Sequence, residues 1–251
     1  MHYVQQDQPP GVPPLELTGE RTLPDVPEEN YWYRRHLAVY EWIAVRVGEL
    51  RVADLACGEG YGADVLARGA VEVVGIDANP EAHAHARARY RGPNLRFERG
   101  LVEDLAGSFD VVVFLQTIEH LEDPAVALER IAAAAPVAYI STPNRLTLAP
   151  AGATKSDNPW HLREYTAPEY RELLEPHFRG VELLGLHHAG KLRLHEIALR
   201  LGWDRLHSAL RLTKPFYERF VPAIASSDFA LKREDEAPLD RALDFVAVCH
   251  A

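Results

Sequence analysis

The sequence predicts an α/β fold in which helices cover both faces of a mostly parallel sheet. Short apolar runs alternate with helical patterns between residues 51 and 187. The first run, Val52-Ala-Asp-Leu-Ala-Cys57, leads into alternating glycines at positions 58, 60 and 62 and then a helical pattern. The second run, Val73-Val-Gly-Ile-Asp77, ends in a carboxylate 23 residues beyond Asp54. This order of strand, glycine turn, helix and acidic strand end predicts a nucleoside-binding βαβ unit.

The remaining elements follow from periodicity and breakers. Residues 1–30 carry six prolines and few apolar positions, so we expect an extended N-terminal arm rather than a packed element. Residues 31–251 then form a single domain that opens with a helix at Tyr31. Within it, the pattern predicts seven strands, at 51–56, 71–76, 94–98, 110–115, 136–141, 181–187 and 242–249, and helices at 61–68, 80–90, 124–134 and 168–178.

The region 189–241 separates the last two predicted strands. Its sequence pattern predicts irregular helical structure, with interruptions at Pro215 and Pro222. A segment of this length inside a domain is usually functional. We therefore expect a helical insertion that acts as a lid or a substrate-binding region.

Composition excludes several classes of protein. The net charge is −10, from 27 basic and 37 acidic residues, and this disfavours nucleic-acid binding, which needs a basic surface. No run of eighteen apolar residues is present, and the N-terminal residues lack the pattern of a signal peptide. The two cysteines, Cys57 and Cys249, lie far apart in the sequence, which argues against a disulfide framework and favours a cytoplasmic location. The oligomeric state is open.

The glycine spacing distinguishes between nucleoside cofactors. Dinucleotide-binding proteins carry G-x-G-x-x-G, whereas the glycines here alternate. The stretch Asp54-Leu-Ala-Cys-Gly-Glu-Gly-Tyr-Gly62 resembles motif I of class I S-adenosylmethionine (SAM) methyltransferases, and Asp77 matches that family's acid on the ribose hydroxyls. The resemblance implies SAM as cofactor. It also implies a Rossmann-like sheet of seven strands in the order 3-2-1-4-5-7-6, with the last strand antiparallel.

The resemblance also implies the residues that bind the cofactor. Asp54 would hold the turn and the amino group of SAM, directly or through water, and Asp77 would accept both ribose hydroxyls. Leu101 stands where many relatives carry an acid, so the adenine contact passes to backbone or to neighbouring acids. The cofactor-binding residues predicted in this way are Asp54, Ala56, Gly58, Gly60, Asp77, Ala78, Leu101, Val102 and Gln116, with Arg35 as a candidate partner of the SAM carboxylate.

Methyl transfer to a neutral hydroxyl benefits from a general base, and histidine is suited to that task near neutral pH. His161, in Asn158-Pro-Trp-His161, is the first candidate for this catalytic residue and His120 is the second. The pair His187-His188 is a weaker alternative. We expect no metal, because the acids near the predicted strand ends, Glu119, Glu122 and Asp123, do not form a convincing set of converging oxygens.

A narrower resemblance concerns the acceptor. Thr18-Gly-Glu-Arg21, Gly185-Leu-His-His-Ala-Gly190 and Ser226-Ser-Asp-Phe229 resemble segments of actinobacterial methyltransferases linked with methylglucose lipopolysaccharide biosynthesis. This implies O-methylation of a sugar or polysaccharide, with another small-molecule hydroxyl as the broader alternative. Two further interpretations stay open: an NAD-linked oxidoreductase, and a SAM-binding protein without catalysis.

Overall fold

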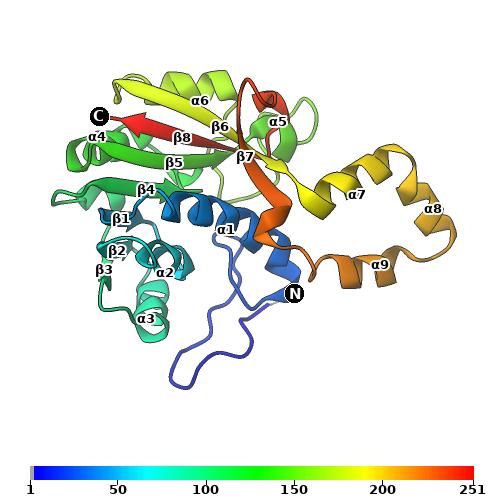
Figure 1. Cartoon of the computed structure of the whole chain (residues 1–251), viewed down its shortest axis with the longest axis horizontal. Helices are drawn as coiled ribbons and strands as arrows, with labels where there is room; N and C mark the ends of the chain where they lie inside the picture. Colours follow the sequence, from blue (N-terminus) through cyan, green and yellow to red (C-terminus); the bar gives the residue numbers. More distant parts are fainter. Residues whose placement is uncertain (1–2) are drawn as a thin grey trace.

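The computed structural model describes residues 3–251, which are built around one eight-stranded sheet (Figure 1). Its order is β3-β2-β1-β4-β5-β8-β6-β7. The pairs from β3 to β5 are parallel, and β8 runs antiparallel to both of its neighbours. The strands are β1 (Arg51–Leu55), β2 (Glu72–Asp77), β3 (Leu95–Arg99), β4 (Val111–Leu115), β5 (Val137–Pro143), β6 (Gly180–His188), β7 (Phe229–Arg233) and β8 (Asp244–His250).

The predicted count of seven strands is wrong because the structure has an additional edge strand, β7. The sequence places this segment, Phe229-Ala-Leu-Lys-Arg233, in the irregular helical region, and several of its residues favour helices intrinsically. It pairs antiparallel with residues 184–188 of β6, and this tertiary pairing overrides local propensity. The antiparallel orientation of the last strand in the chain, now β8, agrees with the prediction.

Successive residues of a strand point to opposite faces of the sheet, so the apolar strands present an apolar surface on each face. Helices cover both of these surfaces. Phe114 contributes to one core, with residues of α4 and α6, whereas Val113 contributes to the other, with residues of α1 and α2. The α-helices are α1 (Asn30–Ala44), α2 (Tyr61–Ala67), α3 (Pro80–Arg89), α4 (Pro124–Ala134), α5 (Arg145–Leu148), α6 (Ala167–Leu174), α7 (Gly190–Arg200), α8 (Trp203–Ala209) and α9 (Thr213–Phe220). Short 3₁₀ helices are η1 (Pro27–Glu29), η2 (Val102–Asp104), η3 (Ile118–His120), η4 (Ser226–Asp228) and η5 (Leu239–Arg241).

The N-terminal segment before α1 is packed against the domain, which departs from the expectation of an unpacked arm. The first two residues of the predicted arm lie outside the described part of the chain. Leu15, Leu23 and Val26 form a small buried cluster of their own. The side chain of Gln5 donates to Glu59 beside the glycine turn, at 3.1 Å. The segment is irregular because of its prolines, but its few apolar residues are enough to fix it in place.

The insertion after β6 holds α7, α8 and α9, which extend away from the sheet as an arm (Figure 1). Aromatic side chains join α7, α8 and α9 through ring contacts such as His195 with Phe220 and His207 with Phe216. Within residues 3–251, none of these three helices contributes a residue to the lining of the cavity described in the next subsection. The lid or substrate-binding role of this insertion stays a prediction. None of the helices in residues 3–251 combines the length and apolar character that a bilayer crossing needs.

Candidate functional site

The turn between β1 and α2 brings backbone N–H groups to the carboxyl ends of the central strands. Gly60 has a φ of 98° and a Cβ at this position would lie 2.8 Å from the Cβ of Ala86, so the position favours glycine on both counts. Gly62 lets α1 approach α2, since a Cβ there would meet the Tyr40 ring at 2.1 Å. Ala56 adopts a φ of 52° without being glycine, which is a strained conformation at the start of the turn.

Asp77, at the end of β2, lies beside this turn. Its Oδ2 accepts a hydrogen bond from the Gly58 N–H at 2.7 Å, and its Oδ1 accepts one from the Asn79 N–H at 2.8 Å. Each carboxylate oxygen has a second lone pair, so the group can still accept from two hydroxyls. Asp77 lines the cavity described below, and the backbone contacts fix the orientation of its carboxylate.

Asp54 lies behind the turn rather than in the cavity. Its side chain is fully buried, and Oδ1 accepts from the Tyr40 hydroxyl at 3.1 Å. Oδ2 has no hydrogen-bond partner among the described residues. Burial raises the pKa of this carboxyl to about 8. Because Oδ2 of Asp54 is buried behind the turn, a contact with the amino group of the expected cofactor would pass through a water more readily than directly.

Glu59 is a residue of the turn whose role the sequence analysis missed. Its buried carboxylate accepts from the Tyr90 hydroxyl at 2.8 Å and contacts Nε2 of His85 at 2.9 Å, in addition to Gln5. These contacts tie the turn to α3 and to the N-terminal segment. Its position inside motif I was the available signal, but Gln5, His85 and Tyr90 are distant from it in sequence.

One cavity of about 850 Å³ extends from the turn to the ends of β4 and β5. Its volume falls in the range of small-molecule sites, roughly 300–1,000 Å³. Of the predicted residues, Asp54, behind the turn, and Gly60, within it, do not line this cavity. The predicted site residues that line it are Arg35, Ala56, Gly58, Asp77, Ala78, Leu101, Val102, Gln116, His120 and His161.

Arg35 is predicted to bind a carboxylate of the cofactor, but the structure engages it elsewhere. Its Nε and Nη2 form two bonds to the Asp244 carboxylate, at 2.6 and 2.5 Å, and Nη2 also donates to the Leu243 carbonyl. This buried pair ties α1 to the start of β8. Arg21 also lines the cavity, and the sequence analysis did not single it out as a ligand although it quoted the surrounding Thr-Gly-Glu-Arg segment.

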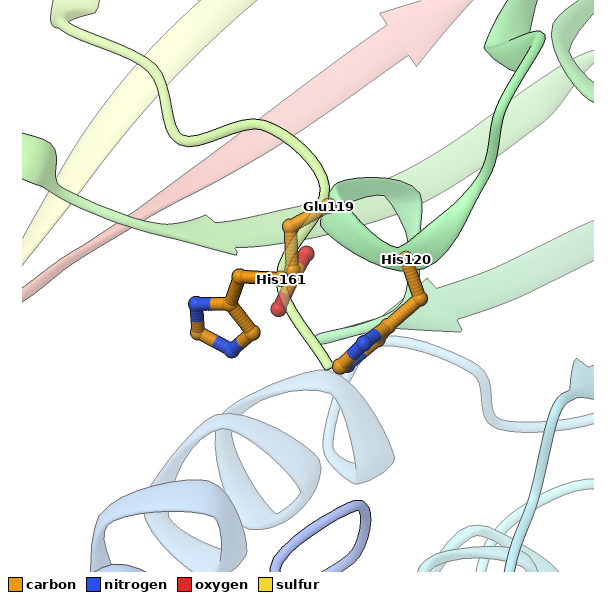
Figure 2. A group of neighbouring side chains, drawn as sticks. All are labelled: Glu119, His120 and His161. Carbon is orange, nitrogen blue, oxygen red and sulfur yellow. The ribbon is translucent and has the colours of Figure 1, made fainter. Parts of the chain in front are cut away.

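At the far end of the cavity, two segments bring together Glu119, His120 and His161 (Figure 2). Glu119 and His120 belong to η3, which follows β4. His161 lies on the loop after α5, and this loop is held to η3 because the Leu162 and Arg163 N–H groups donate to the Glu119 carbonyl. The imidazole centroids of His120 and His161 are 5.1 Å apart.

Each of these side chains is oriented by a second contact. Nδ1 of His161 contacts Glu164 Oε1 at 2.6 Å, and Nε2 lies 3.0 Å from the Asn158 amide nitrogen. Nδ1 of His120 contacts the Trp160 carbonyl oxygen at 2.8 Å, and burial lowers the pKa of His120. Burial also raises the pKa of Glu119 to about 8.

The weaker alternative, His187-His188, is placed apart from these groups. Nε2 of His188 contacts the Tyr31 hydroxyl at 2.8 Å. Neither histidine lines the cavity. Both residues lie on β6, and in the sheet β8 lies between β6 and β5, so they are separated from the ends of β4 and β5.

This geometry can be compared with known proteins. A family model described as a methyltransferase domain matches residues 52–135. The chain is 39% identical over 247 residues to a probable S-adenosylmethionine-dependent methyltransferase of Mycolicibacterium smegmatis, covering 93% of this chain and 94% of that protein. A ubiquinone biosynthesis O-methyltransferase of Psychrobacter arcticus is 35% identical over 106 residues, which cover 38% of this chain and 41% of that protein.

Among solved structures, a SAM-dependent methyltransferase of Thermotoga maritima, described as a possible histamine N-methyltransferase, has a TM-score of 0.58 at 16% identity, covering 89% of this chain and 94% of that one. This likeness concerns the fold. With the near full-length relative, it defines the class: the chain belongs to the SAM-dependent methyltransferases, with the class I α/β fold. The protein is therefore an enzyme that uses SAM, and the alternatives of an NAD-linked oxidoreductase and a non-catalytic SAM-binding protein are set aside.

Proposed function

We propose that the enzyme transfers the methyl group of SAM to a hydroxyl oxygen of a sugar, a polysaccharide or another small molecule. The observation that carries the proposal is the single cavity that joins Asp77 and the glycine turn to the His120–His161 pair. A methyl donor held at one end and a proton acceptor at the other are what hydroxyl methylation requires. The partial match to an O-methyltransferase supports oxygen as the acceptor atom.

The residues around the turn fit SAM. The Asp77 carboxylate has lone pairs available for the ribose hydroxyls, and Oδ2 of Asp54 is open to a water that contacts the amino group. We assign the carboxylate of the cofactor to Arg21, which lines the cavity and forms a 3.2 Å ion pair with the exposed Glu20, because Arg35 is engaged in a buried pair with Asp244. When bound, SAM supplies an electrophilic methyl group.

The proton of the acceptor hydroxyl is assigned to the histidine pair. In the transfer, the bond from methyl carbon to sulfur breaks, the bond from methyl carbon to oxygen forms, and the hydroxyl proton passes to an imidazole. His161 is favoured because Glu164 accepts from its Nδ1 and stabilises the imidazolium. Its Nε2 takes the proton once the acceptor hydroxyl replaces the Asn158 amide, which lies 3.0 Å from it. His120 has the same arrangement with the neutral Trp160 carbonyl, which stabilises a positive charge less.

A glucan of the kind found in methylglucose lipopolysaccharide is the narrower proposal for the acceptor. Trp32 lines the cavity and Trp160 stands next to His161, and both side chains are exposed. Exposed indoles can pack against sugar rings while the histidines face a hydroxyl. The segments that resemble the methylglucose group include Thr18-Gly-Glu-Arg21, which borders the same cavity.

The test is methyl transfer from radiolabelled SAM to short α-glucans, free monosaccharides and phenolic hydroxyls. We expect label in at least one hydroxyl acceptor, and label in glucans if the narrower proposal holds. Trp160→Ala should lower transfer to a glucan more than transfer to a small acceptor, and Trp42→Ala, on α1 and outside the cavity lining, serves as the matched control. Transfer to nitrogen or carbon acceptors alone would contradict the proposal while leaving the family assignment intact.

A further inference from the structure

The Glu119, His120 and His161 side chains form a cluster that the assignment of one proton-accepting histidine does not account for. One potential ligand atom from each residue lies within 4.8 Å of those of the other two (Figure 2). Two ligands on a metal ion are separated by at most about twice the bond length of 2.0–2.2 Å, or ~4.2 Å. A small movement of the side chains is therefore enough to bring the three atoms around one ion.

Both imidazoles are held in the way that metal-binding histidines are held. A histidine ligand usually donates its second N–H to a carboxylate or a backbone carbonyl, which fixes its tautomer. His161 has the Glu164 carboxylate on Nδ1, and His120 has the Trp160 carbonyl on Nδ1. Donation from each Nδ1 leaves each Nε2 with the lone pair that a metal needs.

Glu119 supplies the carboxyl group of the cluster. Its side chain is 1% exposed and accepts from the Thr142 hydroxyl at 3.1 Å. Among the described residues, no lysine, arginine or histidine forms an ion pair with it. A buried carboxylate without a counter-charge is expensive, and a divalent cation at this position would offset the cost.

We propose that Glu119, His120 and His161 bind a divalent transition metal of the Zn²⁺ class. Two imidazole nitrogens and one carboxylate oxygen suit such ions better than the hard cations Mg²⁺ and Ca²⁺, which prefer oxygen ligands. The amide nitrogen of Asn158 lies 3.0 Å from His161 Nε2 and rotates away when the ion binds. The expectation of no metal considered the carboxylates near the strand ends and did not combine them with the two imidazoles.

The role of the ion rests on the proposed function. With three protein ligands, the ion keeps at least one position for the acceptor hydroxyl. Coordination stabilises the alkoxide, so the hydroxyl proton leaves to water in the cavity and the oxygen attacks the methyl group. His161 then acts as a ligand oriented by Glu164, and the metal takes over the task assigned to the imidazole in the metal-free protein.

The experiment measures Zn²⁺ binding by calorimetry on the full chain after removal of bound metal with a chelator, with Mg²⁺ in a parallel titration. We expect one Zn²⁺ per chain, and loss of that binding in Glu119→Gln, His120→Asn and His161→Asn. Glu164→Gln should bind 10–100-fold more weakly, as expected for the loss of an orienting partner. His250→Asn, which removes an exposed histidine at the far end of β8, is the matched control and should bind as the wild type does.

Thermal melts with and without Zn²⁺ keep the test valid for destabilised variants: Zn²⁺ should raise the Tm of the wild type and of His250→Asn, and leave the ligand variants unchanged. Absence of Zn²⁺ binding, equal binding by all variants, or a response to Mg²⁺ alone would overturn the proposed site. Methyl transfer that persists unchanged in chelator would overturn the catalytic role. Zn²⁺ binding at this site without methyl transfer to any hydroxyl would instead contradict the proposed function.

Discussion

The two ends of the cavity are built in different ways. The turn and Asp77 come from one βαβ unit, so this central part of the cofactor end lies within the 24 positions from Asp54 to Asp77 and depends on backbone geometry. The histidine cluster joins η3 to a loop about 40 residues further along, and depends on side-chain contacts such as His161 with Glu164. The first end serves a cofactor shared by a whole family, whereas the second can change with the acceptor.

Removing the imidazole of His161 should test only the end of the cavity that holds the histidine cluster. We expect His161→Ala to lower kcat by about 10²–10⁴-fold, the range for loss of acid–base assistance, with little change in SAM affinity. Rapid-quench assays of methyl transfer and calorimetry with S-adenosylhomocysteine measure the two effects. His177→Ala, a histidine away from the cavity, is the control. A variant that loses cofactor binding as well would show that the two ends are not separable.

Substitution of Asp77 tests the cofactor end of the cavity, where we expect a loss of cofactor affinity. Hydrogen bonds to a charged group contribute about 1.5–3 kcal/mol each, so Asp77→Ala should weaken S-adenosylhomocysteine binding by about 100-fold or more. Asp77→Asn should lose less because it keeps one acceptor. Asp235→Asn, a surface substitution, should bind normally. The measurement is calorimetry at fixed pH, and uptake by Asp77→Ala equal to the wild type would contradict the placement of the cofactor.

The same contrast explains what could be predicted from the sequence. The α/β class, the turn and Asp77 follow from local periodicity and from a contiguous motif. Strand β7 was missed because its residues gain their strand conformation from pairing with β6. Glu164 and the Arg35–Asp244 pair were missed for a related reason: the partners of a buried charge are set by tertiary packing, and spacing along the chain does not show them.

The Asp54 carboxyl, behind the turn at the cofactor end of the cavity, should make the free energy of unfolding depend on pH. Its pKa of about 8 in the folded state exceeds the value near 4 of an exposed aspartate, so folding favours the protonated form. That contribution is complete below pH 4 and is lost as the pH rises toward 8. The free energy of unfolding of the wild type should therefore fall relative to Asp54→Asn between pH 5 and 8, by at most about 1.4 kcal/mol per pH unit. Urea unfolding of both proteins at several pH values measures the difference, and parallel profiles would contradict the raised pKa.

Ala56 gives the smallest expected effect and the finest test of the turn. An alanine in the left-handed region is strained by about 1–2 kcal/mol, whereas glycine adopts this φ freely but has more entropy to lose on folding. Ala56→Gly should therefore raise the free energy of unfolding by up to about 1 kcal/mol, seen as a higher urea midpoint at unchanged slope. Ala133→Gly, on the exposed face of α4, should instead destabilise by a similar amount because its backbone is helical. If both variants destabilise equally, the turn does not hold Ala56 in a strained conformation, and the methyl group of Ala56 would have to matter for packing instead.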